Sequence, residues 1–521
     1  MPPGADAPKL CHAVTTSSPV QLDGSPLTPG QVVRVARQGA RVELGPAARP
    51  GIEASRRAIE GALGDAEPHY GINTGFGSLS RKRIGDEELH ELQRNLVRSH
   101  AAGVGEPLPE DIVRAMLLIL AASLARGRSG VRVELVESIV AMLNAGVTPI
   151  VPEIGSVGAS GDLAPLSHAA LVLIGEGEAT HKSERIAGGE ALRRAGLKPI
   201  TLEAKEGLAL INGTHLMSAR LALIWADLGR VFDAAVIATA MSIDACRGTD
   251  EFLDPRVYEA RNQPGPAEVA ERLRALLAGS QILPSHAEND PRVQDPYSIR
   301  CAPIVLGSVS DSLRGVERAL VAELGAVTDN PLVFPGADGG DIVSAGNFHG
   351  MPLAIPLDTL AIGLAHVAGI SERRVYHMLS AFDEEAHLPP YLSPGPGLHS
   401  GLMIAQYTAA ALCNEIVTLA TPASVYNVTT SAGMEDYNSY GPRAAAKAAR
   451  SLDLTRRVIA IELVCAAQGI EFHRTLRSGA MVEAAIETIR RVVPTLHADR
   501  PPSPDIEAVA ALIADGAFSP A

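Results

Sequence analysis

The stretch "GSVGASGDLAPLSH" at residues 155–168 places a glycine-rich turn directly before an apolar helical segment. Its simplest interpretation is a turn in which Asp162 or Ser160 caps a helix that begins near Leu163. The triplet Ala159-Ser160-Gly161 allows a second interpretation, because Gly161 has no Cβ and its nitrogen can bend back toward the carbonyl carbon of Ala159. Loss of water from such a ring and from the Ser160 side chain would leave an exocyclic methylene. This carbon electrophile would react with a nucleophilic amine.

Helical periodicity dominates the chain on both sides of this turn. Aromatic residues make up only 3% of the chain, which favours close-packed helices. Shorter helical periods lie at 52–63, 86–99, 109–126 and 131–145, and glycine-rich turns lie at 71–77 and 155–161. Long apolar periods lie at 215–246, 302–327, 352–380, 402–420 and 443–468. Several of them are 25 residues or longer without an internal proline. We therefore expect a mainly α fold, with a central bundle of long helices and a loop-rich N-terminal domain.

The composition predicts three parts along the chain. Residues 1–25, rich in Pro, Ser, Thr and Gly, read as a loose extension. Residues 26–210 would form the N-terminal domain that carries the glycine-rich turn, and 211–521 the long-helix bundle with a C-terminal helical region. Within the bundle, "PLAIPLDTLAIGLAHVAGI" (352–370) is apolar nearly all round, so we expect it to be buried among helices or in a subunit interface.

Charge and composition restrict the partners. The net charge of −14 is spread along the chain, which argues against binding to nucleic acid or to an anionic membrane. The first residues lack the pattern of a signal peptide, and the five cysteines show no C-x-x-C spacing. The apolar stretch "AMLLILAASLA" (115–125) is shorter than the roughly 20 residues that span a bilayer. We expect a soluble cytoplasmic protein whose partner is a small molecule.

Common cofactor and metal motifs are missing from the sequence. It contains no G-x-x-x-x-G-K-[ST] loop and no H-E-x-x-H, and "GINTGFG" (71–77) lacks the glycine order of a dinucleotide-binding fold. We therefore expect neither a metal nor a dissociable cofactor, which leaves the 155–168 stretch as the candidate site.

Several motifs together resemble the aromatic amino acid lyase family. Besides the 155–168 stretch they are "YGINTGFG" (70–77), "LINGT" (210–214), "VQDPYSIRC" (293–301), "DNPLVF" (329–334), "GNFH" (346–349) and "MIAQYTAAALCNE" (403–415). The resemblance runs from about residue 25 to 510. It implies the fold of histidine and phenylalanine ammonia-lyases, a homotetramer, and conversion of Ala159-Ser160-Gly161 into a 4-methylideneimidazole-5-one (MIO) group.

Within this family, "SHAAG" (99–103), "VQDPYSIRC" and the pair Glu435-Asp436 are most similar to histidine ammonia-lyases, which convert L-histidine to trans-urocanate and ammonia. Phenylalanine and tyrosine lyases usually carry Phe-Leu or His-Leu where this chain has Ser99-His100. Arg98 and Tyr407 keep a histidine or tyrosine 2,3-aminomutase open as an alternative, along with a tyrosine ammonia-lyase. A non-catalytic helical scaffold with the family fold is a further alternative.

The resemblance also implies roles for the reaction itself. Tyr70 would be the base, as a phenolate, that takes the β-proton of the substrate; without the motif it would read as a loop tyrosine. Arg300 would bind the substrate carboxylate, although a lone arginine is more often in a surface ion pair. Tyr297 lies three residues earlier, so a helix would place both on a similar face. Asp162 would assist ring closure.

The remaining candidates would bind the substrate or support the MIO ring. Asn212 and Gln294 match positions that hydrogen-bond the substrate or the cofactor, and Phe348 matches a residue beside the ring; capping and core packing are their structural alternatives. Ser99 and His100 would lie at the far end of the pocket. Glu415 would orient the imidazole, because a carboxylate within the apolar stretch "TAAALCNEIVTLA" (408–420) is costly to bury without a function.

Overall fold

The computed structural model describes residues 18–64, 67–69, 71–74, 84–85, 88–288, 290–336 and 340–520. The chain forms two compact units. Unit 1 comprises residues 1–226, 317–357 and 423–446, and unit 2 comprises residues 227–316, 358–422 and 447–521. The expected N-terminal domain, 26–210, therefore lies inside unit 1, and the expected bundle, 211–521, is distributed over both units.

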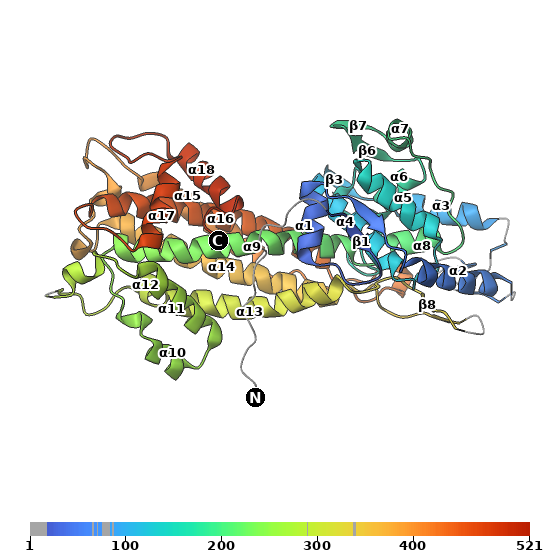
Figure 1. The fold of residues 1–521 in the computed structure, drawn as a ribbon, viewed down its shortest axis with the longest axis horizontal. Helices are drawn as coiled ribbons and strands as arrows, with labels where there is room; N and C mark the ends of the chain where they lie inside the picture. Colours follow the sequence, from blue (N-terminus) through green and yellow to red (C-terminus); the bar gives the residue numbers. More distant parts are fainter. Residues whose placement is uncertain are drawn as a thin grey trace. The chain divides into compact units, whose positions relative to one another are not determined.

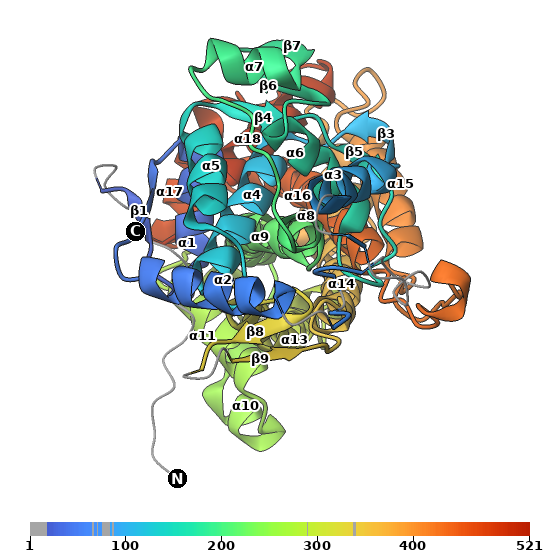
Figure 2. The same cartoon turned by 90° about the vertical axis from the view of Figure 1, so that its right-hand side faces the viewer.

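Unit 1 is built around a buried helix. Its complete helices are α1 (Pro29–Gln38), α2 (Arg49–Leu63), α3 (Leu89–His100), α4 (Glu110–Ala125), α5 (Val133–Asn144), α6 (Leu163–Leu173), α7 (Gly188–Arg194) and α8 (Glu206–Ile211). Almost every side chain of α4 from Val113 to Ala125 is buried, which explains why this helix is apolar all round. It packs against α1, α2 and α5, whereas α3, α6 and α8 pack against one another (Figure 2).

Small sheets complete unit 1. Its strands are β1 (Val20–Leu22), β2 (Val42–Leu44), β3 (Val104–Pro107), β4 (Val147–Pro149), β5 (Pro152–Ile154), β6 (Glu178–His181), β7 (Glu184–Ala187), β8 (Leu332–Phe334) and β9 (Asp341–Val343). β1 pairs with β2 in parallel, and the pairs β3–β5, β4–β6, β6–β7 and β8–β9 are antiparallel. The β3–β5 pair leads directly into the glycine-rich turn, because β5 ends at Ile154.

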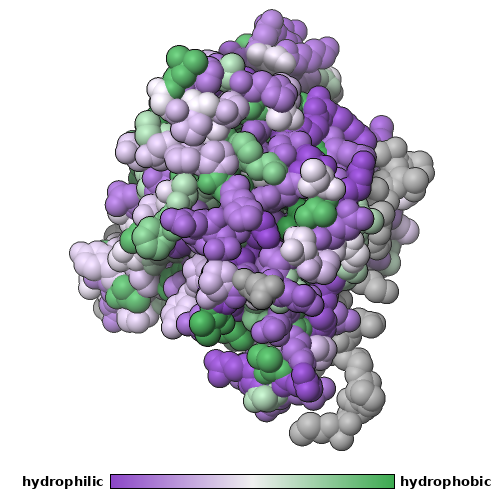
Figure 3. Space-filling model, turned by 90° about the vertical axis from the view of Figure 1, so that its left-hand side faces the viewer, coloured by the Kyte–Doolittle hydropathy of each residue, from purple (hydrophilic) through white to green (hydrophobic). Residues whose placement is uncertain are grey.

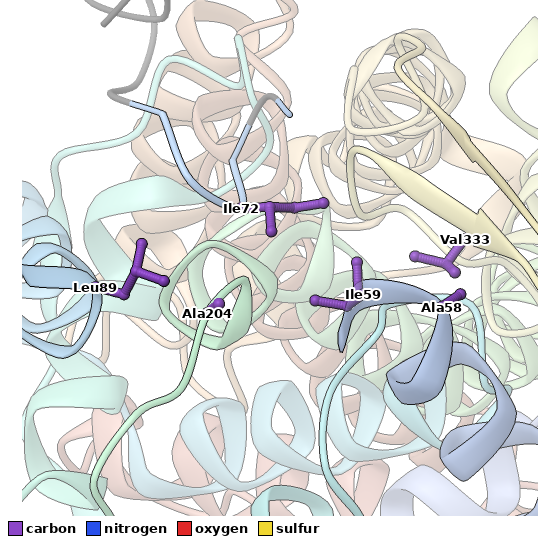
Figure 4. Close-up of a cluster of buried hydrophobic side chains, with 6 residues drawn as sticks. All are labelled: Ala58, Ile59, Ile72, Leu89, Ala204 and Val333. Carbon is purple, nitrogen blue, oxygen red and sulfur yellow. The ribbon is translucent and has the colours of Figure 1, made fainter. Parts of the chain in front are cut away.

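Apolar side chains from distant parts of the sequence meet in the core of unit 1. One buried cluster joins α2, α3 and β8 to the segments before α3 and α8, and consists of Ala58, Ile59, Ile72, Leu89, Ala204 and Val333 (Figure 4). Full burial of an aliphatic side chain contributes roughly 1.5–3 kcal/mol. These contacts therefore hold the segments that lead into α3 and α8, both of which carry candidate site residues near their C-terminal ends.

Unit 2 is made of helices. It holds α10 (Pro255–Arg261), α11 (Pro264–Leu277), α12 (Tyr297–Arg300), α15 (Met403–Leu419), α17 (Ala480–Arg490) and α18 (Pro502–Ala514). The chain passes between the units five times, once after α15 at residues 422–423 and four times inside long helices: α9 (His215–Ala245), α13 (Ala302–Glu323), α14 (Met351–Ser380) and α16 (Gly441–Glu471) (Figure 1). Ala368, Ile416, Leu454 and Val458 form a buried cluster between α14, α15 and α16. The predicted mainly α fold with long helices is confirmed.

Two features of α14 bear on the expected burial of this segment among helices or in a subunit interface. The helix contains an internal proline, Pro356, which lies within its first two turns. Ile355 and Ile362 are exposed, so the helix is not buried on every side. By length and composition α14 could cross a membrane, but 56% of its most apolar window is buried inside the protein, as in the core helix of a globular fold. On the face shown in Figure 3, hydrophobic residues lie singly or in small groups among hydrophilic ones.

Candidate active site

The turn that carries Ser160 is in close backbone contact with a second glycine. Gly161 has a φ of 74°, in the left-handed region that glycine adopts without strain. It forms an isolated β-bridge with Gly213, and the Asp162 amide donates to the Gly213 carbonyl over 2.7 Å. A Cβ on Gly161 would lie only 2.1 Å from that carbonyl oxygen. Only glycine fits here, and the absence of a side chain is also what ring closure within Ala159-Ser160-Gly161 requires.

A second segment of unit 1 holds the other side of the turn. Ser439 Oγ donates to the Gly158 carbonyl over 3.0 Å, and the Tyr440 amide donates to the Val157 carbonyl over 2.9 Å. Inside the turn, Ser156 Oγ donates to the Gly161 carbonyl over 3.1 Å. Contacts on both sides hold the turn in a fixed shape, and Ala159 is buried within it.

The Ser160 hydroxyl faces a carboxylate that the sequence interpretation left without a role. Ser160 Oγ donates to Glu435 Oε1 over 2.8 Å, and the other carboxylate oxygen, Oε2, accepts from Thr430 Oγ1 over 2.9 Å. Neither Ser160 nor Asp162 caps α6 through its side chain in the way the local interpretation predicted. The Glu435-Asp436 pair marked the family resemblance, and this was the only sequence signal for Glu435.

Asp162 is buried and binds the start of another helix. Its Oδ2 accepts from the amides of Leu216 and Met217, over 2.9 and 3.2 Å, in the first turn of α9. Amides at the start of a helix have no partner within it, so the Asp162 carboxyl group serves as their acceptor. The positive end of the helix dipole also stabilises a negative charge at this position. Burial raises the pKa of Asp162 to about 7, although these amides and the nearby charge of Arg220 act in the opposite direction. Asp162 is therefore a helix cap, but of α9 rather than of α6.

Asn212 precedes the glycine that contacts the turn. It follows α8, and its amide donates to the Leu208 carbonyl over 3.0 Å. Its side chain is buried, yet the Oδ1 atom has no hydrogen-bond partner among the described residues. A buried carbonyl oxygen without a partner is costly, so this atom is suited to accept a hydrogen bond from a bound molecule.

Ser99 and His100 end α3. Ser99 Oγ donates to the Leu96 carbonyl over 3.1 Å, and His100 Nδ1 lies 2.9 Å from the same oxygen. A carbonyl can only accept, so this contact calls for a proton on Nδ1, which also lies 3.1 Å from Ser99 Oγ. Arg98, which had kept the aminomutase alternative open, binds Glu176 on the surface over 2.8 Å.

Phe348 lies half-buried in the loop between β9 and α14. Its neighbour His349 bonds to the Tyr437 carbonyl over 3.1 Å, and the two rings stack with their centroids 6.3 Å apart. This loop is therefore held against the segment that contains Glu435.

Three candidates of unit 2 lie in or beside α12. The Arg300 guanidinium lies over the Tyr297 ring, 4.5 Å from its centroid, which confirms that the two share a face. Tyr297 is 69% exposed, and Gln294 is also exposed. A buried side chain holds this short helix in place. Arg374, which is fully buried and paired with Glu462, donates to the Ser298 carbonyl over 3.2 Å.

The expected burial of Glu415 is wrong. Its side chain is exposed and forms an ion pair with Arg450 over 2.8 Å. The hydrogen bonds from Arg450 hold the pKa of Glu415 below its usual value. Its apolar neighbours do not form one buried face, because Ile416 is buried whereas Val417 is exposed. The remaining candidate, Tyr70, lies outside the described residues.

No group of three or more His, Cys, Asp or Glu side chains among the described residues is arranged to hold a metal ion. Unit 1 brings together the Ser160 turn, Asp162, the Asn212-Gly213 segment and Glu435. Unit 2 brings together Tyr297 and Arg300.

This constellation belongs to a known class of proteins. The model of the aromatic amino acid lyase family matches residues 27–491, and the chain belongs to this family. A histidine ammonia-lyase of Anaeromyxobacter dehalogenans is 50% identical over 507 residues, which cover 95% of this chain and 99% of the relative. The crystal structure of histidine ammonia-lyase from Trypanosoma cruzi matches with a TM-score of 0.89 and 41% identity, over 96% of this chain and 94% of that one. Tyrosine aminomutase from Streptomyces globisporus matches with the same TM-score and 36% identity, over 96% and 98%.

Proposed function

We propose that this chain is a histidine ammonia-lyase, which eliminates ammonia from L-histidine to give trans-urocanate. The observation that carries the proposal is the Ser160 turn, in which Gly161 contacts Gly213 and the Ser160 hydroxyl faces Glu435. The 50% identity to a histidine ammonia-lyase over nearly the whole chain supports the choice of substrate.

Ala159, Ser160 and Gly161 would form the MIO group. The left-handed Gly161, which has no room for a Cβ, fits this group. Once formed, the group supplies an electrophilic carbon to which an amine can add. Glu435 accepts a hydrogen bond from the Ser160 hydroxyl, which needs a further proton to leave as water, and the buried Asp162, with a pKa near neutrality, can hold a proton beside the turn.

The polar residues of unit 1 would recognise the rest of the substrate. Asn212 offers a buried oxygen that can accept from a substrate N–H. In its neutral form, with the proton on Nδ1, His100 would offer the Nε2 lone pair to the N–H of an imidazole, and Ser99 binds the same Leu96 carbonyl. Phe348 would pack beside the ring of the MIO group.

The residues of unit 2 would bind the carboxylate end of a substrate. Arg300 supplies a permanent charge with paired donors, and Tyr297 and Gln294 supply further polar groups next to it. Tyr70 would take the β-proton. We further propose a cytoplasmic homotetramer in which each site draws on more than one subunit, and in such an assembly the exposed Glu415 would orient the imidazole.

The test is incubation of the purified protein with L-histidine, L-tyrosine and L-phenylalanine, followed by ultraviolet absorption and product analysis. We expect free urocanate from L-histidine, and an intact mass lower by two waters than the sequence requires. Ser160→Ala should show the full sequence mass, retain the fold and lose turnover. Activity that survives this substitution would refute the mechanism.

A 2,3-aminomutase is the second candidate, because a tyrosine aminomutase matches the fold as well as the lyase does. The same incubation separates the two. A β-amino acid without free unsaturated acid would identify a mutase, and an unmodified protein without turnover would identify a scaffold.

A further inference from the structure

The last residue of the opening motif, His168, has no part in the chemistry described above. It lies on α6, half-buried, and its Nε2 accepts a hydrogen bond from the Gly103 amide over 3.0 Å. An imidazole nitrogen can accept only when it carries no proton, so the ring is neutral with its proton on Nδ1. Burial lowers the pKa of His168, which favours this form at neutral pH.

Gly103 is closely enclosed at this contact. A Cβ on Gly103 would lie 3.1 Å from His168 Nε2 and 3.3 Å from the Pro152 side chain. A Cβ on Gly155, the first residue of the Ser160 turn, would lie 3.0 Å from the Gly103 Cα. The residues that follow α3 are therefore wedged between the start of the Ser160 turn and the side of α6.

The ion pairs between α3 and the residues that follow α6 are weaker than this hydrogen bond. Arg94 and Arg98 both bind Glu176, but their side chains are 54% and 45% exposed. Exposed ion pairs of this kind contribute little and allow the side chains to move. The backbone of the turn after α3 is thus held by its enclosure, by the β3–β5 pair that begins at Val104, and by the hydrogen bond to His168.

We propose that His168 is a positioning residue for substrate recognition, which holds the turn after α3, and with it Ser99 and His100, in place beside the Ser160 turn. This inference rests on the proposed function, because it assigns Ser99 and His100 to the substrate side chain. Both halves of the 155–168 motif would then serve the same site. The Ser160 turn carries the electrophile, and α6, which follows it, aligns Ser99 and His100 through His168.

Amide variants of His168 provide a matched test. In His168→Gln the side-chain oxygen reaches about as far as Nε2 and can accept from Gly103, whereas the amide of His168→Asn is one bond too short. His168→Leu removes the acceptor at similar volume. We expect the KM for L-histidine to rise about five- to tenfold in the Asn and Leu variants, with kcat within about threefold, and to return close to the original value in the Gln variant. All three variants should retain the mass deficit of two waters.

Hydrogen exchange gives a readout that needs no substrate. The amide of Gly103 should exchange faster in the Asn and Leu variants, and should regain its protection in the Gln variant. The proposal is overturned if KM and the exchange of residues 101–104 are the same in all variants. It is also overturned if kcat and the mass deficit are lost while KM is unchanged, because His168 would then act on the electrophile. If the unaltered protein acts on L-tyrosine or L-phenylalanine instead, the proposed function fails, and the same KM comparison on that substrate still tests His168.

Discussion

Asp162 and Glu415 are two carboxylates whose surroundings in the fold are the opposite of what their neighbours in sequence suggest. Asp162 follows a glycine-rich turn, where a charged side chain is ordinarily solvated, yet it is fully buried and its pKa is raised to about 7. Glu415 lies in an alanine-rich apolar segment, yet it is exposed and its ion pair with Arg450 lowers its pKa.

The difference lies in what each carboxylate satisfies. Asp162 is the partner of two backbone amides that begin α9, and such amides can be buried only if an acceptor is buried with them. Glu415 has a flexible partner that solvent can replace. A polar residue is thus buried where the backbone needs it, whatever the hydropathy of its neighbours in sequence.

The largest effect is expected at Asp162. In Asp162→Asn an oxygen remains to accept from Leu216 and Met217, so the fold should persist, but the ionisable group beside the turn is gone. We expect kcat to fall by about 10³-fold together with the mass deficit. Asp162→Ala should in addition lower the free energy of unfolding by about 2–4 kcal/mol, because two buried amides lose their acceptor. Intact mass, kcat and denaturant unfolding measure these effects, and an active Asn variant with full mass deficit would contradict the role in ring closure.

The next effect separates two glutamates. Glu435→Gln should lower kcat by about 10²-fold, because Glu435 lies beside the Ser160 side chain, whose carbon becomes the electrophile, and its charge is removed at nearly constant shape. Glu415→Gln should lower kcat as well, because the proposed role of Glu415 is to orient the imidazole in the assembled protein. Kinetics on L-histidine at saturating concentration test both. A change of less than about threefold in Glu415→Gln would leave the exposed pair with Arg450 as its main contact and would contradict the proposed role in orienting the imidazole.

These pairs also show how far the sequence leads. Helical periodicity located the long helices within a few residues, and three-residue spacing placed Tyr297 and Arg300 on one face, because both signals are local. The contact of Ser160 with Glu435 joins residues 275 positions apart, so no local pattern reports it. Asp162 is a similar case. Its residue type and position predicted a helix cap, but no local pattern indicates that the helix it caps begins more than 50 residues later. Family motifs supplied the chemistry of the Ser160 turn, which spacing alone leaves indistinguishable from an ordinary turn.

Burial of Asp162 predicts a pH dependence of stability. Its folded pKa of about 7 lies above the ordinary aspartate value of 3.8, so between these values the unfolded chain ionises Asp162 while the folded chain keeps it protonated. The stability that this group contributes is therefore full below about pH 4 and is lost as the pH rises through 7. The free energy of unfolding of the unaltered protein, minus that of Asp162→Asn, should fall by on the order of 1–4 kcal/mol from pH 4 to pH 8. A flat or rising difference would show that Asp162 is ionised in the folded protein.

The smallest effect is expected for the ion pair of Glu415 with Arg450. Both side chains are about half exposed, at 45% and 52%, so solvent screens their attraction and each loses side-chain freedom on pairing. A double-mutant cycle of Glu415→Gln and Arg450→Gln should give an interaction of at most about 0.5 kcal/mol, and less in high salt. Because Asp453 also lies 3.6 Å from Arg450, Asp453→Asn is the matched control that removes the other acid near this arginine. An interaction above about 2 kcal/mol would show that Glu415 is desolvated. Asp162 and Glu415 would then differ in their hydrogen-bond partners, backbone amides against an arginine, and no longer in their exposure to solvent.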